Sequence, residues 1–378
     1  MGFLISIIQK GVKVLESFAV HGAPSEYILQ EGVLQLLEDK LVERGFQKVL
    51  IVHGQKSWDA ARPYWPVFEN IDFNDYTYRG ECSLGEISRL AEGVKFHSFD
   101  CIIGVGGGKV LDLVKAVSYL TRVPHVLVPT LASNCSPWTP ISVIYDELGA
   151  FIRYDIYPVS ASLLLIEPRI LLEAPIEMFI AGIGDTLAKW YEADVQIATI
   201  KNKPVALEIS HYTARQCRDL ILQHSENAII AAKTRELNDE FIKVAETIIV
   251  LGGMVGGFGD HYGRIAGAHA VHNGLTVLNE THHALHGDKV AYGILVQLVL
   301  EKKWSEIDKL LAFYRRIGLP FSIKGLGVKE IKDDSIHAVA IKATIPEESI
   351  HVMPNGPITA EKVCLAIKEL EDYILTVC

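Results

Sequence analysis

The sequence predicts an α/β domain built on a parallel sheet over residues 1–166, followed by an all-helical domain over residues 167–378. In the first part, continuous apolar runs of strand length alternate with amphipathic helical runs, as in parallel sheets covered by helices on both faces. After about Glu167, helical periodicity dominates and strand-like runs disappear. A chain of 378 residues, 49% of them hydrophobic, is long enough to bury the cores of both parts.

The expected elements of the first domain follow in a regular order. Helical spacing of apolar residues predicts helices at residues 33–41, at 84–94 and from the glycine-rich turn to about residue 119. Uninterrupted apolar runs predict buried strands at residues 48–52, 100–104 and 125–128. Strands that are separated by helices in this way are expected to lie parallel in one sheet.

The predicted helical domain is divided at three prolines and by a glycine cluster: Pro168, Pro175, Pro204 and residues 252–259. We expect the glycines to interrupt the helical pattern. They allow either close packing between helices or a ligand-binding loop, and packing is the preferred interpretation. Before the glycine cluster, the apolar helical run at residues 181–190 is expected to place one carboxylate, that of Asp185, at the start of a helix.

Composition and charge exclude several classes of function. A formal net charge of −10 and a pI near 5.8 argue against binding to nucleic acid or to an anionic membrane. The apolar run at residues 1–8 is shorter than the roughly 20 residues of a membrane span and lacks the features of a signal peptide. The six cysteines form no C-x-x-C pair, which favours free thiols in a reducing compartment. We therefore expect a cytoplasmic protein without nucleic-acid or membrane partners.

A carboxylate and separated histidines indicate a metal site. Two histidine-containing segments, residues 268–274 and 282–287, follow Asp185 by about eighty residues or more. One carboxylate with two histidines forms a three-ligand site that keeps one coordination position open, which suits catalysis better than structure. For any single histidine, a hydrogen-bonded core residue is the alternative interpretation.

A glycine-rich turn indicates a cofactor site. Residues 104–112 read Gly-Val-Gly-Gly-Gly-Lys-Val-Leu-Asp, follow a predicted strand and open a predicted helix. Glycines let the backbone approach a pyrophosphate, and a helix N-terminus offers free N–H groups to it. The run matches neither the G-x-G-x-x-G nor the GxxxxGK[ST] pattern, so an ordinary tight turn remains the alternative.

Taken together, the ordered motifs resemble the iron-containing alcohol dehydrogenase family in its glycerol-dehydrogenase-like branch. The resemblance covers nearly the whole chain and rests on the glycine-rich turn and on six further segments: residues 128–133, 142–145, 182–188, 268–274, 286–291 and 348–354. It implies a Rossmann-like nucleotide-binding domain, a helical metal-bearing domain in a dehydroquinate-synthase-like architecture, and an active site between them. It also implies a small-molecule substrate and a homo-oligomer.

By this resemblance, the family's metal ligands fall on three positions: Asp185, His269 and His286. The fourth ligand of iron-dependent members would be at Lys189, which cannot bind a metal while protonated. Zinc is therefore expected, with iron as the alternative. His272 and His282 are the competing imidazoles; the family places His272 near the nicotinamide, and we expect it to relay a proton to solvent as a catalytic residue.

Cofactor contacts are expected along the glycine-rich turn and the segments that follow it: Gly106, Gly107, Gly108, Lys109, Asp112, Thr130, Ser133, Thr139, Ile141 and Tyr145. NAD-preferring members of the family carry an aspartate after the first strand, where this chain reads His-Gly-Gln-Lys-Ser at residues 53–57. Gly54 and Lys56 could instead accept a 2′-phosphate, so NADP(H) is expected in preference to NAD(H). Lys56 is otherwise a solvated surface residue.

The substrate side departs from the family pattern. Polyol-oxidising members have an aspartate where this chain has Cys135, and the loss of that anion makes a negatively charged substrate easier to tolerate. With Trp138, this segment resembles the hydroxycarboxylate dehydrogenases, which act on 2-oxo and 2-hydroxy acids. Cys135 and Trp138 are expected to line the substrate site, or alternatively to be packing residues. A covalent role for Cys135 is disfavoured because a metal would already activate the carbonyl group.

The leading hypothesis is therefore a metal-dependent oxidoreductase that transfers hydride between NAD(P)H and a small 2-oxo or 2-hydroxy acid. The nearest alternative is a glycerol or polyol dehydrogenase of the same fold. A sugar-phosphate cyclase would need a cluster of cations near the metal, for which only Lys189 and Arg264 are candidates. A non-catalytic nucleotide-binding protein is a remote alternative.

Overall fold

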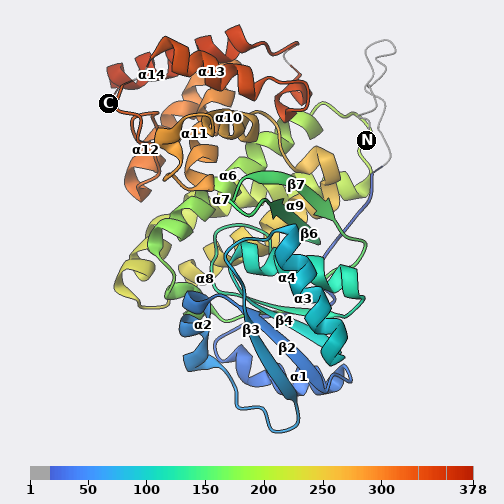
Figure 1. Ribbon diagram of the computed structural model, residues 1–378. Coiled ribbons are helices and arrows are strands. Elements are labelled where there is room, and N and C mark those ends of the chain that lie inside the picture. Colours follow the sequence, from blue (N-terminus) through green and yellow to red (C-terminus); the bar gives the residue numbers. More distant parts are fainter. Residues whose placement is uncertain (1–17, 331, 355, 378) are drawn as a thin grey trace.

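The protein consists of a sheet-containing part and a helical part joined end to end (Figure 1). The computed structural model describes residues 18–330, 332–354 and 356–377. The apolar run at residues 1–8 lies outside the described residues. The change from strands to helices falls between the last strand, β8 (Leu163–Ile166), and helix α5 (Pro168–Leu172).

Six strands form one sheet in the order β1-β8-β5-β4-β2-β3, and every neighbouring pair is parallel. Besides β8, these strands are β1 (Tyr27–Leu29), β2 (Lys48–His53), β3 (Asp72–Thr77), β4 (Cys101–Gly106) and β5 (His125–Pro129). The connecting helices are η1 (Val33–Leu36), α1 (Leu37–Glu43), α2 (Gln55–Ala61), η2 (Arg62–Tyr64), α3 (Leu84–His97) and α4 (Gly108–Thr121). The predicted parallel α/β arrangement is confirmed.

Both faces of the sheet are buried, as the continuous apolar strands predicted. Along β2, Leu50 and Val52 point into one hydrophobic cluster, whereas Val49 and Ile51 point into the other. Successive side chains of a strand point to opposite faces, so a strand that is covered on both sides must be apolar throughout.

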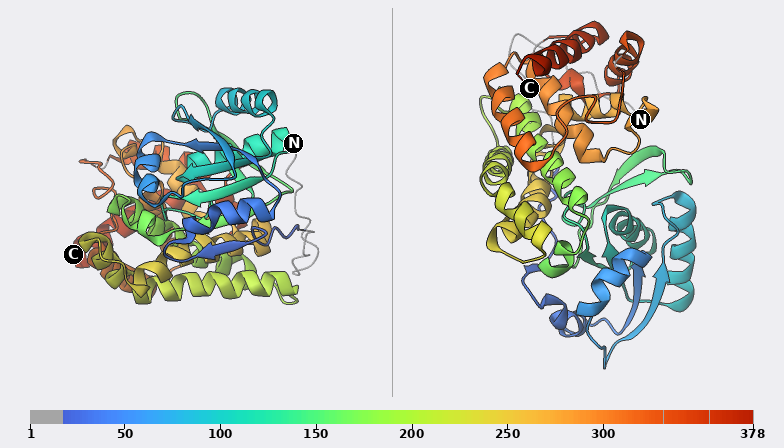
Figure 2. Two further views of the ribbon diagram at one scale, coloured as in Figure 1. Left: turned by 90° about the horizontal axis from the view of Figure 1, so that it is seen from below. Right: turned by 90° about the vertical axis from the view of Figure 1, so that its left-hand side faces the viewer.

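Several strands were not predicted. The edge strand β3 reads Asp-Phe-Asn-Asp-Tyr-Thr and is largely exposed, so no apolar run marks it. Strands β6 (Ile141–Tyr145) and β7 (Phe151–Ile156) form a separate antiparallel hairpin. This hairpin lies where the sheet-containing and helical parts meet, as the views in Figures 1 and 2 agree.

The described residues after β8 form helices and no strand, which confirms the second half of the prediction. The longer ones are α6 (Ile176–Ile197), α7 (Val205–Thr234), α8 (Asp239–Glu246), α9 (Gly252–Gly259), α10 (Gly267–Leu275), α11 (His286–Leu300), α12 (Trp304–Ile317), α13 (Asp333–Ala343) and α14 (Ala360–Val377). The short ones are η3 (Thr247–Leu251), η4 (Asp260–Gly263), η5 (Asn279–Thr281) and η6 (Ser349–Val352).

The glycine cluster was expected to interrupt the helical pattern, and this was wrong. Residues 252–259 are helix α9, which continues α8 through a π-helical turn. The glycines serve close packing, as preferred: a Cβ on Gly259 would clash with Oγ of Ser210 in α7, and one on Gly257 would lie 2.5 Å from the carbonyl oxygen of His21. The stretch 239–263 has the length and apolar composition of a membrane-spanning helix, but 61% of its apolar window is buried inside the protein, as in a core helix.

Candidate metal and nucleotide site

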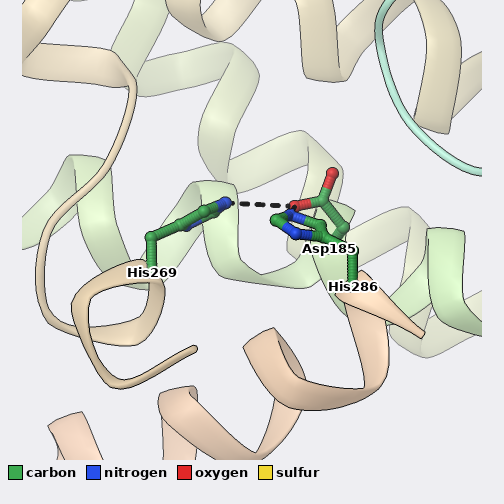
Figure 3. A group of neighbouring side chains, drawn as sticks. All are labelled: Asp185, His269 and His286. Carbon is green, nitrogen blue, oxygen red and sulfur yellow. Dashed lines mark ion pairs between the residues drawn. The ribbon is translucent and has the colours of Figure 1, made fainter. Parts of the chain in front are cut away.

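Three helices bring the predicted metal ligands together. Asp185 comes from α6, His269 from α10 and His286 from α11, and their ligand atoms all lie within 4.8 Å of one another. The Nε2 atoms of His269 and His286 lie 3.4 and 3.6 Å from Oδ1 of Asp185. Figure 3 shows the imidazole of His269 directed at this carboxylate.

The position of Asp185 within its helix corrects the sequence analysis. Asp185 lies in the middle of α6, not at its start, because the helix already begins at Ile176 after Pro175. Close packing then brings the third ligand to it. A Cβ on Gly287 would clash with the backbone carbonyl of Ala181, so only glycine lets α11 approach α6 this closely next to His286.

One oxygen of the cluster lacks a hydrogen bond. Oδ1 of Asp185 is buried and has no hydrogen-bond partner, although Lys189 Nζ lies 3.8 Å from it. Burial alone would raise the pKa of Asp185, but the charge of Lys189 and the histidines His269 and His286 lower that pKa well below its ordinary value. A buried anionic oxygen with two imidazole nitrogens around it fits a divalent cation, because zinc and iron both take such oxygen and nitrogen ligands.

Lys189 occupies the position of the fourth ligand. Its side chain is only 11% exposed, and although this partial burial lowers the pKa of Lys189, the neighbouring Asp185 raises it above the ordinary value. The side chain therefore stays protonated and carries a positive charge at this place. This is consistent with a three-ligand site.

His269 is held by a carboxylate that the sequence analysis missed. Glu192 is fully buried, and its Oε2 lies 2.6 Å from Nδ1 of His269. Its Oε1 accepts hydrogen bonds from the backbone N–H groups of Ala266 and His269, at 2.7 and 2.9 Å. Burial would lower the pKa of His269, but Glu192 and Asp185 raise it to about 9. Glu192 lies two turns after Asp185 on α6, a spacing that could have suggested a shared helix face.

His286 is held by a longer series of contacts. Its Nδ1 lies 3.0 Å from Nε2 of His272, whose Nδ1 lies 3.0 Å from Oδ1 of Asn273. Nδ2 of Asn273 donates to both carboxylate oxygens of Glu348, at 2.9 and 3.1 Å. Burial and the neighbouring histidines lower the pKa of His272 well below its ordinary value. The competing histidine His282 contacts the carbonyl of Thr276 instead.

The glycine-rich turn joins β4 to α4, as the cofactor prediction requires. A Cβ on Gly106 would lie 2.7 Å from Val110, and one on Gly107 would lie 2.6 Å from Leu131, which follows β5. Packing around the turn therefore already requires two of the three glycines. Gly108 begins α4, whose N-terminus offers unpaired N–H groups to an anion. Thr130 N donates to the carbonyl of Gly106 at 3.0 Å, which places that predicted contact beside the turn.

Two other predicted cofactor residues meet at the same turn. Nζ of Lys109 lies 2.5 Å from Oε1 of Glu81 and 5.1 Å from the centre of the Tyr145 ring. Burial raises the pKa of Tyr145 to about 12, so the ring keeps its hydroxyl proton near neutral pH. Ser133 packs against α6: a Cβ on Gly182, three residues before Asp185, would lie 2.8 Å from its Cα.

Asp112 holds the chain around the turn in place. Its carboxylate is buried and accepts hydrogen bonds from Ser136 Oγ at 2.6 Å and from the backbone N–H of Val143 at 2.9 Å. Nζ of Lys115 lies 2.9 Å from it and also donates to the carbonyls of Ser136 and Thr139. These bonds fix the segment that carries Thr139 and Ile141. Direct contact between Asp112 and a cofactor stays a prediction.

The predicted substrate residues lie in different surroundings. Burial raises the pKa of the Cys135 thiol, although the positive charge of Lys189 counteracts this rise. A thiol in this state is a poor nucleophile, which argues against covalent catalysis. Trp138 is buried, and its indole N–H donates to the carbonyl of Gly22 at 3.0 Å. Those are contacts of a core aromatic, and a role for Trp138 in substrate binding stays a prediction.

An acid that the sequence analysis overlooked, Asp75, lies beside the turn after β2. Gly54 N donates to Ser57 Oγ at 3.0 Å, and that hydroxyl also donates to the carbonyl of Val105 in β4. Lys56 is exposed on the first turn of α2. On the neighbouring strand, Oδ2 of Asp75 lies 3.5 Å from Nε2 of His53. The strand β3 that carries Asp75 was not predicted, so its position beside the turn could not be seen.

Known proteins are similar to this chain in sequence and in structure over both its sheet-containing and its helical part. A family model described as iron-containing alcohol dehydrogenase matches residues 24–168. Hydroxycarboxylate dehydrogenase A of Escherichia coli (strain K12) is 37% identical over 351 residues, which cover 93% of this chain and 96% of that protein. Glycerol dehydrogenase of Citrobacter freundii is 36% identical over 375 residues, covering 96% of each chain. The crystal structure of glycerol dehydrogenase from Schizosaccharomyces pombe has a TM-score of 0.85 at 27% identity, over 96% of this chain and 92% of that one.

Proposed function

The chain belongs to the iron-containing alcohol dehydrogenase family, and we propose that it reduces small 2-oxo acids to 2-hydroxy acids, and catalyses the reverse reaction, with NADP(H) as cofactor. The family relationship makes the protein a metal-dependent, nicotinamide-dependent dehydrogenase that acts on an alcohol or hydroxy acid. The substrate class, the metal and the choice of NADP are the parts that we propose.

One observation carries the substrate proposal: the charge beside the metal ligands is positive. Lys189 is a largely buried cation 3.8 Å from Asp185, and position 135 carries the neutral thiol of a cysteine instead of a carboxylate. A carboxylate substrate would find a partner for its charge here, whereas an acid at position 135 would repel it. The similarity to hydroxycarboxylate dehydrogenase A supports the same substrate class.

The residues divide the chemistry between them. Asp185, His269 and His286 would hold the metal, and a divalent cation supplies Lewis acidity toward a substrate carbonyl oxygen. The turn at residues 106–108 and the N-terminus of α4 would hold the cofactor's pyrophosphate, and the nicotinamide supplies the hydride. Lys189 would orient the substrate carboxylate. We propose zinc rather than iron as the metal, because Lys189 leaves three ligands.

The proposed preference for NADP(H) rests on the turn after β2. No acid lies in that turn, while Gly54 leaves the backbone open and Lys56 is exposed beside it. Asp75 opposes this preference, because its carboxylate lies beside His53 at the start of the turn. A comparison of kcat/KM with NADPH and with NADH tests the proposal, and Lys56→Ala should reduce the rate with NADPH alone.

Location and assembly are proposals as well. The cysteines that the structure describes form no disulfides; they are Cys82, Cys101, Cys135, Cys217 and Cys364. Free thiols support a reducing, cytoplasmic location. We propose a homo-oligomer, as the resemblance to this family implies, and sedimentation of the purified protein tests it.

Glycerol dehydrogenase is the second candidate, because relatives with that name match the chain over nearly its whole length. Steady-state rates with 2-oxobutyrate and NADPH, compared with glycerol and NAD, separate the two functions. We expect Cys135→Asp to lower kcat/KM for 2-oxobutyrate by at least about tenfold, because a new anion would repel the substrate carboxylate. Cys135→Ser is the matched control, since it changes no charge. Fast glycerol oxidation with no reduction of 2-oxo acids would contradict the proposal.

A further inference from the structure

We infer that two carboxylates, Glu192 and Glu348, determine which ring nitrogen each ligand histidine presents to the metal. Glu192 acts directly on His269, and Glu348 acts on His286 through Asn273 and His272. The inference rests on the proposed metal site and assigns positioning roles to side chains around it. Neutral imidazole carries one N–H and one lone pair, so the partner of one nitrogen decides whether the other can bind a metal.

The contacts of Glu192 leave one arrangement for His269. A carboxylate only accepts hydrogen bonds, and Oε1 of Glu192 already accepts two backbone N–H groups. Its Oε2, 2.6 Å from Nδ1 of His269, therefore receives a proton carried on Nδ1. In the neutral ring that a metal binds, this leaves the lone pair on Nε2, the nitrogen that faces Asp185 at 3.4 Å. Glu192 is fully buried, so water does not compete for this bond.

The proton position on His286 follows in the same way from a series of three hydrogen bonds that begins at Glu348. Because the carboxylate of Glu348 accepts from Asn273, the amide nitrogen of Asn273 faces Glu348 and its oxygen faces His272. His272 must then donate from Nδ1 and accept at Nε2.

His286 consequently donates from Nδ1 to His272 and keeps its lone pair on Nε2. That Nε2 faces Asp185 at 3.6 Å. Both ring nitrogens of His272 are thereby engaged, so this role replaces direct proton relay to solvent. Each ligand histidine thus has its N–H directed away from Asp185 and its lone pair directed toward it.

The hydrogen bonds that hold the two ligand histidines differ in how strongly they constrain each ring. His269 is 12% exposed and held by one short bond to a buried carboxylate, whereas His286 is 52% exposed and held through three bonds. A series of bonds with partly exposed members transmits less constraint than one buried bond. Loss of Glu192 should therefore affect the site more than loss of His272.

The test measures zinc affinity by competition with a chromophoric chelator, with zinc alone and no substrate or cofactor. Glu192→Gln keeps the size of the side chain but turns an N–H toward Nδ1 of His269, which forces the proton onto Nε2. We expect zinc affinity to fall by roughly 10- to 100-fold. His272→Leu removes the acceptor for His286 and should cost less, about three- to tenfold.

A matched control is Glu371→Gln. Glu371 also accepts hydrogen bonds inside the helical part, from the Tyr292 hydroxyl and the backbone N–H of Ile323, but lies outside the ligand cluster. The Glu371→Gln protein should bind zinc with an affinity within about twofold of that of the unchanged protein. Nitrogen-15 spectra of histidine-labelled, zinc-loaded protein give an independent readout, in which both ligand rings should bind zinc through Nε2 and carry the proton on Nδ1.

The outcomes separate this inference from the proposed function. If the unchanged protein binds no zinc or iron, the proposed metal site itself fails. If it binds zinc but Glu192→Gln and His272→Leu bind equally well, or if either ring binds through Nδ1, the positioning roles are overturned. If His272→Leu loses activity while its zinc affinity is unchanged, His272 acts as a proton relay and not as a support. If the Glu192→Gln protein fails to fold, the zinc affinity of His272→Leu and the nitrogen-15 spectra of the unchanged protein still test the positioning roles.

Discussion

Two helices of this protein each carry an aspartate followed about one turn later by a lysine, and the two aspartates have different roles. In α4, in the sheet-containing part, the buried Asp112 is followed one turn later by the buried Lys115; in α6, in the helical part, the buried Asp185 is followed one turn later by Lys189. Lys115 Nζ lies 2.9 Å from its aspartate and Lys189 Nζ lies 3.8 Å from its own. From the sequence, both aspartates were predicted to serve ligands.

The difference lies in what else reaches each carboxylate. Asp112 accepts hydrogen bonds from Ser136 and Val143, so its oxygens are satisfied by the protein itself. Oδ1 of Asp185 is buried without a hydrogen bond and faces two imidazole nitrogens. Buried polar atoms are normally paired, so an unpaired one surrounded by metal-binding groups marks a ligand site. A satisfied aspartate holds structure, and an unsatisfied one is available for a metal.

The largest effect is expected at the unsatisfied carboxylate. Asp185→Asn keeps the shape of the side chain but removes the anionic ligand, so the metal should be lost and activity should fall at least about a thousandfold. Elemental analysis after dialysis and steady-state rates with 2-oxobutyrate check this. Far-UV circular dichroism should show that the helices remain. Retained metal together with more than a tenth of the activity would place the ligand site elsewhere.

The satisfied carboxylate should instead affect stability. Asp112→Asn would leave the ammonium group of Lys115 buried without its counter-ion, at a cost of about 3–5 kcal/mol in the free energy of unfolding. Urea unfolding measures this, and the double change with Lys115→Met should recover most of the loss. If Asp112→Asn unfolds within about 1 kcal/mol of the unchanged protein but binds NADPH more weakly, Asp112 is a cofactor residue as first predicted.

The fold could be predicted where burial leaves a pattern in the sequence. Strands β2, β4 and β5 are buried on both faces and read as continuous apolar runs, so their positions were found to within a few residues. The edge strand β3 is exposed and polar, and local pattern cannot distinguish it from a loop. The glycines of α9 were expected to interrupt a helix because their weak helix propensity is visible locally, whereas their tight packing against His21 is not.

The metal site could likewise be predicted only where the residue types themselves indicate the role. Asp185, His269 and His286 could be proposed because aspartate and histidine are characteristic metal ligands, and the family resemblance fixed their positions. Glu192 and Glu348 were not proposed, because a glutamate has the same appearance in the sequence whether it is solvated or accepts hydrogen bonds inside the protein. The distinction between Asp112 and Asp185 also depends on donors from distant segments, such as Val143, which only the folded chain brings near.

His125 tests whether an unpaired buried atom alone is sufficient. Its Nδ1 lies 2.8 Å from Ser118 Oγ, which itself donates to the carbonyl of Val123, so His125 donates from Nδ1. Its Nε2 is buried without a hydrogen bond, yet His125 belongs to no cluster of metal-binding groups among the described residues. We therefore expect His125 to be a neutral core residue that binds no ion.

The pH dependence of the unfolding free energy tests this expectation for His125. The effect should be smaller than those of Asp185→Asn and Asp112→Asn. Burial, and then the charge of Lys115, lower the pKa of His125 to about 3 in the folded protein, from an ordinary value of 6.5. The unfolded chain therefore binds this proton first as the pH falls. The contribution of His125 is complete above pH 6.5 and decreases below it, by about 2 kcal/mol at pH 5. His125→Asn can still donate to Ser118 but does not titrate, so its unfolding free energy should lack this decrease. An equal decrease in both proteins would show that His125 is not the group responsible.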